Sequence, residues 1–397
     1  MNAKRYLKIT LLLISTLTVM AGALIAPALP KMAQSFGDRP DAAFLTKMVL
    51  TMPALLIAIT SPFAGALVDR FGRLRLLRAA MIFYAIAGGA GLFLENIYWL
   101  LISRALLGMA VAFIMTIVTT LVGDYLEGEE RGRFLGIQGG FMAFGGTVFV
   151  SVSGLLSDIS WRLPFAVYLL SIPFLFFVYR YLHEPKAAEE GAEDAVLSVP
   201  TGGKLRLYLT VYATVFFGMA LFYLAPAQLP FLMESIGVTQ ASLASIGLVV
   251  ITLTAAAMSI SYQRIKGYWT FQQVYVFTFL MMGLGFGSVF WATNFTGVVA
   301  AMAVAGLGAG LLMPNTSFCL LSNAPPRMRG RVLGGMTSAI FLGQFFSPVL
   351  VQPSVRVFEF GGTYLLSGLL SLVVSGIFLA LVLRYRYRHL RWLKEGV

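Results

Sequence analysis

One arginine stands out among the residues of this chain that could do chemistry, because it lies well inside a long uncharged stretch. Arg104 shares a helical face, at steps of three and four residues, with Gly108, Val111, Met115 and Thr119. A charge at the centre of a membrane helix costs about 2.5–3.5 kcal/mol on insertion scales, so Arg104 should face a cavity or a bonding partner. Two interpretations stay open: a residue on the path of a substrate or a proton, or a structural residue bonded to the unwound end of the first apolar stretch.

A short polar segment between two apolar stretches is the second candidate. Asp69 lies there at a helix end, where cationic or amide partners stabilise a carboxylate. Its candidate partners are Arg73 and the helix start near Gly330–Val332, which is rich in free amides. Gly65 and Gly72 would permit a tight loop between the helix ends, because glycine adopts backbone conformations that other residues rarely reach.

Several other kinds of chemistry lack the residues they need. His183 and His389 have no partners at useful spacing, and no Asp or Glu lies in the middle of an apolar stretch, so a catalytic pair, a metal site and a cofactor site are not indicated. The single cysteine, Cys319, allows no intrachain disulfide. The net charge of +12 comes without a basic stripe interleaved with aromatic residues, so no nucleic-acid partner is expected.

The elements that carry these residues belong in a lipid bilayer. The chain is 58% hydrophobic and 12% charged, whereas soluble proteins carry about 25% charged residues. Its apolar blocks are continuous rather than alternating, which excludes a β-barrel and predicts helices of about 20 residues each. The first block has 22 uncharged residues, too many for a signal peptide with an apolar core of about 7–15. We predict an all-α polytopic membrane protein with twelve spans, over residues 9–30, 43–65, 77–95, 98–122, 134–156, 163–182, 207–232, 241–262, 272–292, 297–321, 332–354 and 363–383.

The distribution of Lys and Arg predicts the orientation of these spans. With the N-terminus in the cytoplasm, 23 of these residues fall on the cytoplasmic side. Five fall outside, namely Lys31, Arg39, Lys47, Arg162 and Arg356. Because cytoplasmic loops carry the excess of positive charge, both termini are expected in the cytoplasm.

An internal repeat divides the chain into halves. Arg131–Gly136 matches Arg329–Gly334 at an offset of 198 residues, and at that offset Gly108 meets Gly306 and Gly145 meets Gly343. The first and seventh spans end in similar proline pairs, "IAPALPK" and "LAPAQLPF", where Gln228 is the inserted residue. Six spans separate the copies, so the halves have the same orientation, as in one class of secondary transporters. The predicted domains are residues 1–183 and 205–397, joined by a polar linker over 184–204.

The segment "GALVDRFGRLRLL" resembles the signature of the major facilitator superfamily, Gly-x-Leu-x-Asp-Arg-x-Gly-Arg. The matching positions are Gly65, Leu67, Asp69, Arg70, Gly72 and Arg73, while Leu74 replaces the usual basic residue. "RALLGMAVA" and "WRLPF" are similar to the family's fourth and sixth spans. The resemblance covers essentially the whole chain and implies a transporter that works by alternating access.

The resemblance also implies a conformational switch. Related proteins link the signature loop to an acidic residue that ends the fourth span, and Asp124 lies there. The expected cluster Asp69–Arg73–Asp124, with Gly65, Arg70 and Gly72 shaping the loop, would latch the two halves together on the cytoplasmic side. The alternative is a surface ion pair worth about 0–1 kcal/mol.

Proton coupling is implied by the resemblance, but the residues do not supply a carrier. The antiporter signature of the fifth span is incomplete, because Phe149 and Val150 stand where Gly-Pro is usual. The carboxylates that could carry a proton, Asp69, Asp124 and Asp158, all lie near helix ends.

The resemblance also implies a substrate cavity lined mainly by spans one, four, seven and ten. Its predicted lining is Met115, Thr119, Tyr212, Phe216, Met219, Tyr223, Gln228, Asn315 and Thr316. Such soft, mostly apolar walls suit amphipathic or hydrophobic compounds. The expected function is proton-coupled efflux of such a small molecule by a monomer in a bacterial inner membrane. The alternative is a facilitator or a flippase for a lipid-like anion, without proton coupling, in which Arg104 meets an anionic headgroup.

Overall fold

The computed structural model describes residues 2–37, 39–185, 203–325 and 328–395, and of these the side chains of residues 2, 3, 69 and 385–395 fall outside the description. Most of the predicted linker, residues 184–204, therefore also lies outside it.

The all-α prediction is confirmed. The N-terminal bundle comprises α1 (Asn2–Ala23), η1 (Ala26–Ala28), α2 (Leu29–Ser35), α3 (Ala42–Phe71), α4 (Arg73–Gly89), η2 (Ala90–Leu92), α5 (Ile97–Tyr125), α6 (Gly128–Ile159), η3 (Leu163–Leu170) and α7 (Ser171–Tyr181). The C-terminal bundle comprises α8 (Gly203–Phe222), α9 (Leu224–Ser235), α10 (Ala241–Tyr268), α11 (Phe271–Ser288), η4 (Val289–Trp291), α12 (Phe295–Asn323) and α13 (Arg329–Glu395).

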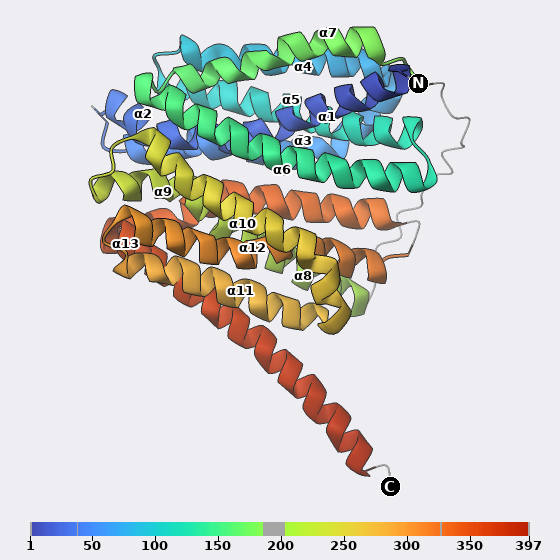
Figure 1. Cartoon of the computed structure of the whole chain (residues 1–397), viewed down its shortest axis with the longest axis vertical. Helices are drawn as coiled ribbons and strands as arrows, with labels where there is room; N and C mark the ends of the chain where they lie inside the picture. The colour runs from blue at the N-terminus through green and yellow to red at the C-terminus, as the bar shows by residue number, and fades with distance from the viewer. Residues whose placement is uncertain (1, 38, 186–202, 326–327, 396–397) are drawn as a thin grey trace.

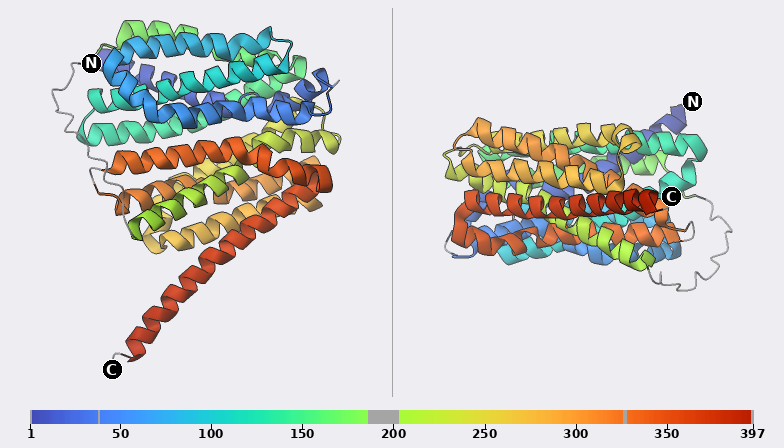
Figure 2. Two further views of the ribbon diagram at one scale, coloured as in Figure 1. Left: turned by 180° about the vertical axis from the view of Figure 1, so that it is seen from behind. Right: turned by 90° about the horizontal axis from the view of Figure 1, so that it is seen from below.

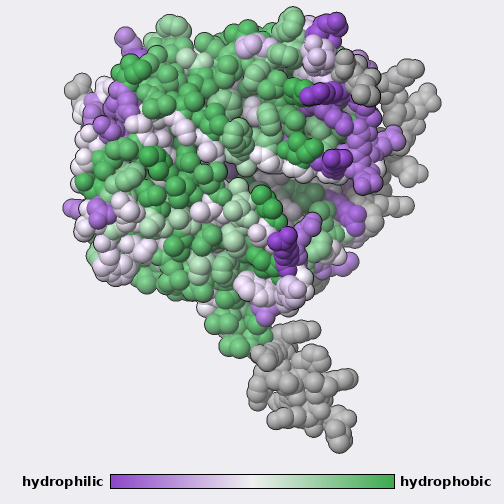
Figure 3. All heavy atoms as spheres, viewed as in Figure 1, coloured by the Kyte–Doolittle hydropathy of each residue, from purple (hydrophilic) through white to green (hydrophobic). Residues whose placement is uncertain are grey.

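The two bundles lie one above the other in Figure 1, with their helices running broadly in the same direction across the page. The N-terminus lies at one end of the helices, which we call the linker end, and α2 and α9 lie at the opposite, distal end (Figures 1 and 2). Hydrophobic residues dominate the visible sides of both bundles in Figure 3. The bundles contact each other through α3 and α13 and through α6 and α10.

Eleven helical segments in the described part of the chain are long and apolar enough to cross a membrane. The last, Arg329–Arg384, has 56 residues, about 84 Å at 1.5 Å per residue, and so contains two of the predicted spans. We expected a loop between these spans. Instead the backbone turns within α13 at Glu359, whose φ of 56° and ψ of −167° are not helical. Two arms of α13 thus replace spans eleven and twelve, and the red second arm leaves the bundle obliquely in Figure 1.

The repeated glycines form the same kind of helix crossing in both bundles. A Cβ atom on Gly108 of α5 would lie 2.4 Å from the carbonyl oxygen of Pro53 in α3. Its counterpart Gly306 of α12 would place a Cβ atom 2.5 Å from the carbonyl oxygen of Ile251 in α10. Only glycine permits such close backbone approach, so the duplicated sequence builds duplicated packing.

The proline pairs break the first helix of each bundle, and serine side chains bond the carbonyls near the breaks. Proline has no N–H group, so α1 ends before η1, and α8 ends before α9. Ser153 of α6 donates a hydrogen bond to the carbonyl of Leu24. Ser347 of α13 donates one of 2.6 Å to the carbonyl of Ala220. Both serines are buried, so each break is held by its own bundle.

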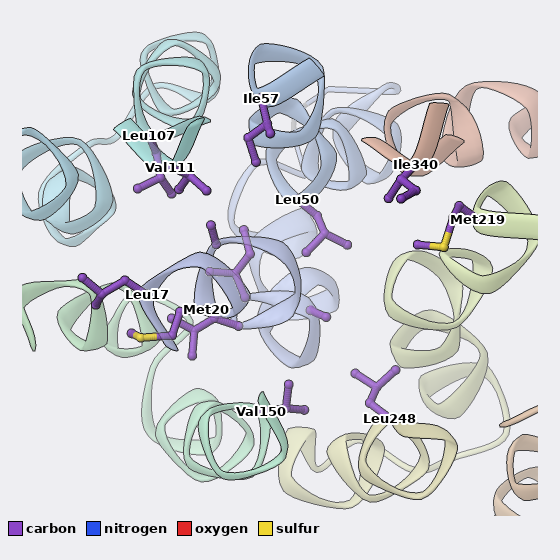
Figure 4. Close-up of a cluster of buried hydrophobic side chains, with 14 of the residues drawn as sticks. Leu17, Met20, Leu50, Ile57, Leu107, Val111, Val150, Met219, Leu248 and Ile340 are labelled. Carbon is purple, nitrogen blue, oxygen red and sulfur yellow. The ribbon is translucent and has the colours of Figure 1, made fainter. Parts of the chain in front are cut away.

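Aliphatic side chains fill the middle of the interface between the bundles. Figure 4 shows Leu50 of α3 facing toward Met219 and Ile340 of the C-terminal bundle, with Leu248 of α10 also on that side. Leu17 and Met20 lie on the side of α1 that faces away from the C-terminal bundle. All six are buried, with at most 7% of their surface exposed. This apolar layer separates the distal end from the cavity at the linker end.

Candidate functional site

A cavity of about 730 Å³ lies between the bundles toward the linker end, where Figure 3 shows the surface hollowed. Its walls come from α3, α5 and the first arm of α13. They consist of Ser61, Pro62, Met115, Thr116, Thr119, Thr120, Gly330, Arg331, Gly334, Gly335, Thr337 and Ser338. A second cavity of about 250 Å³ lies between α1, α5 and α6 and shares Met115 and Thr119 with the first. Two predicted cavity residues therefore lie at the junction of both spaces.

The hydroxyl groups of this cavity are oriented by their own helices. Thr116, Thr119 and Thr120 donate to backbone carbonyls of α5 at 2.8–2.9 Å. Thr337 does the same on α13 at 3.0 Å. Each hydroxyl has one proton, and that proton is already donated to a backbone carbonyl. The oxygen lone pairs therefore remain to accept hydrogen bonds from a bound molecule. The cavity therefore presents mainly hydrogen-bond acceptors on apolar walls, with Arg331 as the charged residue among those that line it.

The predicted stripe on the seventh span packs against other helices and does not line these two cavities. Tyr212 donates to the carbonyl of Val332 at 2.9 Å, and the Phe216 ring lies 6.2 Å from that of Phe346. Met219 belongs to the apolar layer. Tyr223 donates to the carbonyl of Gly22 at 2.7 Å and so joins the two bundles. Helical spacing predicts a shared face, but it does not say which neighbour that face meets.

Asn315 and Thr316 were also predicted to line the cavity, and here the prediction is wrong. Asn315 accepts from Tyr262 at 3.3 Å and donates to the carbonyl of Phe271 at 3.1 Å. Thr316 lies 3.0 Å from the hydroxyl of Tyr275. Both side chains are buried and bonded inside the C-terminal bundle, toward α10 and α11.

Gln228 is likewise buried rather than placed at an outer mouth. Only 1% of its surface is exposed, and both amide atoms lack a hydrogen-bond partner within the described residues. Burying an amide without hydrogen-bond partners costs free energy, so Gln228 destabilises the packing around α9 in this state.

Arg104 has a structural environment inside the N-terminal bundle. Its Nη2 atom donates to the carbonyls of Ala87 and Gly88, both at 2.7 Å, where α4 ends. The guanidinium also lies 4.9 Å from the ring centres of Phe165 and Tyr168. The residue is fully buried, so these contacts leave no opening to either cavity. The sequence allowed a structural role, but the direct partner is the end of α4 rather than the break in the first span.

The predicted cluster at the linker end is present in part. Arg73 Nε lies 2.8 Å from an Asp124 oxygen, which joins α4 to α5. Glu184, which the sequence placed in the linker, accepts from the backbone N–H groups of Arg73 at 2.6 Å and of Leu74 at 2.9 Å. The Asp69 side chain lies outside the described residues. These contacts lie within the N-terminal bundle, so a latch between the bundles stays a prediction.

The signature loop is a single residue. Gly72 has φ of 86°, in the region that favours glycine, and separates α3 from α4. Gly65 was expected in the same loop, but it lies inside α3, and a Cβ atom there would meet nothing within 4 Å. Arg70 is exposed, with its guanidinium 5.4 Å from the Phe71 ring.

The distal end holds the bundles together through several polar contacts. Asp158, at the end of α6, accepts from the first backbone N–H groups of α10 at Ala241 and Ser242, at 2.7 and 3.3 Å. Gln34 of α2 donates to Glu234 of α9. These contacts cross between the bundles, so the molecule is closed at the distal end.

Lys47 is a buried cation at this closed end. The sequence counted it among the outer charges, but it lies within α3 and is 1% exposed. Its Nζ atom lies 4.8 Å from the ring centre of Phe231 and 5.5 Å from that of Phe360. A cation over an aromatic ring gains about 0.5–2 kcal/mol. The rings therefore offset part of the cost of burying this charge.

A comparison of sequences now decides the family. A sequence model of the Major Facilitator Superfamily matches residues 11–348, which include both cavities' walls and the distal contacts. The chain belongs to the Major Facilitator Superfamily. This is a family of membrane transporters rather than enzymes, and the described helices that are long and apolar enough to cross a membrane agree with that membership.

Individual relatives match this major facilitator over shorter segments. It is 30% identical over 112 residues to the niacin transporter of Acinetobacter baylyi, covering 28% of this chain and 26% of the relative. It is 31% identical over 182 residues to multidrug resistance protein 1 of Bacillus subtilis, covering 43% and 45%. The matches thus span less than half the length of these relatives. Among solved structures, a D-xylose-proton symporter shares the fold with a TM-score of 0.76 at 16% identity, over 95% of this chain and 97% of that one.

Proposed function

We propose that this major facilitator exports amphipathic small molecules from the bacterial cytoplasm across the inner membrane, in exchange for protons, as a monomer. The linker end would face the cytoplasm, as the distribution of Lys and Arg predicts. The observation that carries the proposal is the cavity between the bundles, open toward the linker end and closed at the distal end. In alternating access, the two bundles would rock about this cavity and expose it to the other side.

The walls of the cavity favour a particular kind of substrate. Methionine, threonine methyl groups and proline supply apolar contacts, and the oriented hydroxyls supply acceptors. A molecule with an apolar body and hydrogen-bond donors would satisfy both, whereas a purely polar sugar would leave the apolar wall uncovered. The similarity to a multidrug resistance protein supports an exporter of this kind.

The flippase alternative has less support. It relied on Arg104 meeting an anionic headgroup, and the bonds of Arg104 to Ala87 and Gly88 lie within the N-terminal bundle. The proposed domain division remains residues 1–183, 184–204 and 205–397, with Asp69, Arg73 and Asp124 as part of the switch between states.

Transport by purified protein in liposomes tests the proposal. With an imposed pH gradient, we expect the donor-bearing amphiphile Hoechst 33342 to move against its own gradient, at least tenfold faster than in protein-free liposomes. Xylose and a fluorescent anionic phospholipid should not move. Transport of Hoechst 33342 at the same rate without the pH gradient would contradict proton exchange, and movement of the phospholipid alone would favour the flippase.

A further inference from the structure

The second cavity, between α1, α5 and α6, has a side-chain amide on its wall. Gln138 of α6 lines this cavity of about 250 Å³, and its Nε2 atom donates to the Ser15 hydroxyl of α1 at 2.6 Å. The other hydroxyl groups on the wall belong to Thr18 and Thr119. All three hydroxyls donate to carbonyls of their own helices at 2.7–2.8 Å. Among the polar side chains that line this cavity, Gln138 is therefore the one that can still donate a hydrogen bond.

Ser15 fixes the orientation of that amide. Ser15 is 2% exposed, and its single hydroxyl proton goes to the carbonyl of Leu11. Its oxygen can then only accept, so it must meet the NH₂ end of Gln138 and not the carbonyl end. Within the described residues, the second N–H and the carbonyl oxygen of Gln138 have no hydrogen-bond partner. Gln138 thus keeps one donor and one acceptor, side by side in one plane, for a molecule in this cavity.

The surface of α6 beside this amide is bare. Gly139 lines the same cavity, and a Cβ atom there would meet nothing within 4 Å. The same holds for Gly136 and Gly140. Packing in this state does not require these glycines, and glycine lets a ligand approach the backbone closely. A flat group can therefore lie against α6 next to the Gln138 amide.

The two cavities divide the space for a substrate unequally. Sites for drug-sized ligands have volumes of about 300–1,000 Å³, so the second cavity admits only part of such a molecule, whereas the first, of about 730 Å³, has room for its body. Met115 and Thr119 border both cavities, so one molecule can extend from one into the other.

We propose that Gln138 determines substrate specificity by binding a planar group that carries an N–H donor and an acceptor on one edge, such as a carboxamide or a lactam. A glutamine amide pairs with such an edge through two hydrogen bonds, as it does with adenine in DNA. The apolar body of the same molecule occupies the first cavity. The inference rests on the proposed function and names the polar group that its substrates share.

Equilibrium dialysis of the purified protein in lipid nanodiscs tests the inference without a proton gradient, with empty nanodiscs to subtract binding to lipid. The probes are naphthalene-2-carboxamide and its N,N-dimethyl derivative, which keeps the carbonyl but lacks the N–H donor. We expect the wild type to bind the carboxamide at least fivefold more tightly. Gln138→Met and Gln138→Leu, which keep the size of the side chain but neither hydrogen-bonding group, should bind both probes with affinities within twofold of each other. The melting temperature of each variant shows that it is folded.

The ratio of the two affinities separates specificity from a structural role. If Gln138 only ties α6 to α1 through Ser15, its replacement would weaken both probes equally and leave the preference intact, which would overturn the inference. A wild type without the preference would do so too. Gln272→Leu is the matched control, because Gln272 is exposed on α11 and lines neither cavity, so the preference should persist. If the wild type fails to transport Hoechst 33342, the proposed function fails, while dialysis still decides whether Gln138 recognises the amide edge.

Discussion

Replacement of Arg104 by leucine is expected to destabilise the N-terminal bundle by about 2–4 kcal/mol. The change removes the donor that two carbonyls at the end of α4 share, and a buried polar group without a partner costs about 1–3 kcal/mol. It also leaves space between Phe165 and Tyr168, because leucine does not reach both rings. The Tyr168 ring in turn meets Tyr84, which donates to the carbonyl of Leu17, so the damage should reach α1.

Size-exclusion chromatography of the detergent extract, followed during heating, measures this effect. We expect Arg104→Leu to yield less monodisperse protein and to lose it at a lower temperature than the wild type. Arg104→Lys, which retains a cation and donors, should lie between them. If Arg104→Leu were as stable as the wild type but inactive, the residue would belong to a substrate or proton path, and the structural role assigned to it would be wrong.

Replacement of Met115 by tryptophan is expected to reduce transport at least tenfold without unfolding the protein. Met115 lies where the two cavities meet, so a larger ring there would occupy the space that a substrate needs. Because the ring enters existing space, the cost of overpacking should be smaller than in a filled core, where it is about 1–3 kcal/mol.

The control for this change is Met109→Trp on the same helix. Met109 is 36% exposed and is absent from the walls of both cavities, so transport should stay within twofold of the wild type. Hoechst 33342 efflux from liposomes and the melting temperature of both variants should be measured together. Normal transport by Met115→Trp would place the substrate elsewhere.

The sequence predicts the fold well because its signals are local or repeated. Continuous apolar blocks require helices in a bilayer, and the 198-residue offset anticipates equivalent crossings at Gly108 and Gly306. The pairing of Arg73 with Asp124 follows from the family resemblance. The boundary between the last two predicted spans, 332–354 and 363–383, contains the turn at Glu359, although a kink within one long helix replaces the expected loop.

The direction in which buried side chains point was much harder to predict. Asn315 and Thr316 lie on a helix expected to border the cavity, yet their partners come from α10 and α11. Periodicity gives the face of a helix but not its rotation within the bundle. Lys47 was overlooked because it lies near a helix end, although the predicted span 43–65 already contained it. The position of this lysine inside a predicted membrane span could have identified it as a buried charge.

The account depends most on the distal end opening during each cycle, and one crosslinking measurement tests this directly. Gln34→Cys and Glu234→Cys replace two side chains that touch across the bundles, in a Cys319→Ser background, and a short reducible thiol crosslinker joins them. Crosslinking Lys4→Cys to Glu130→Cys, whose native side chains pair at 2.7 Å within the N-terminal bundle, is the control. We expect the distal crosslink to abolish Hoechst 33342 transport until a reductant restores it, and the control crosslink to leave it unchanged. Transport that continues with the distal crosslink complete would contradict alternating access through this end.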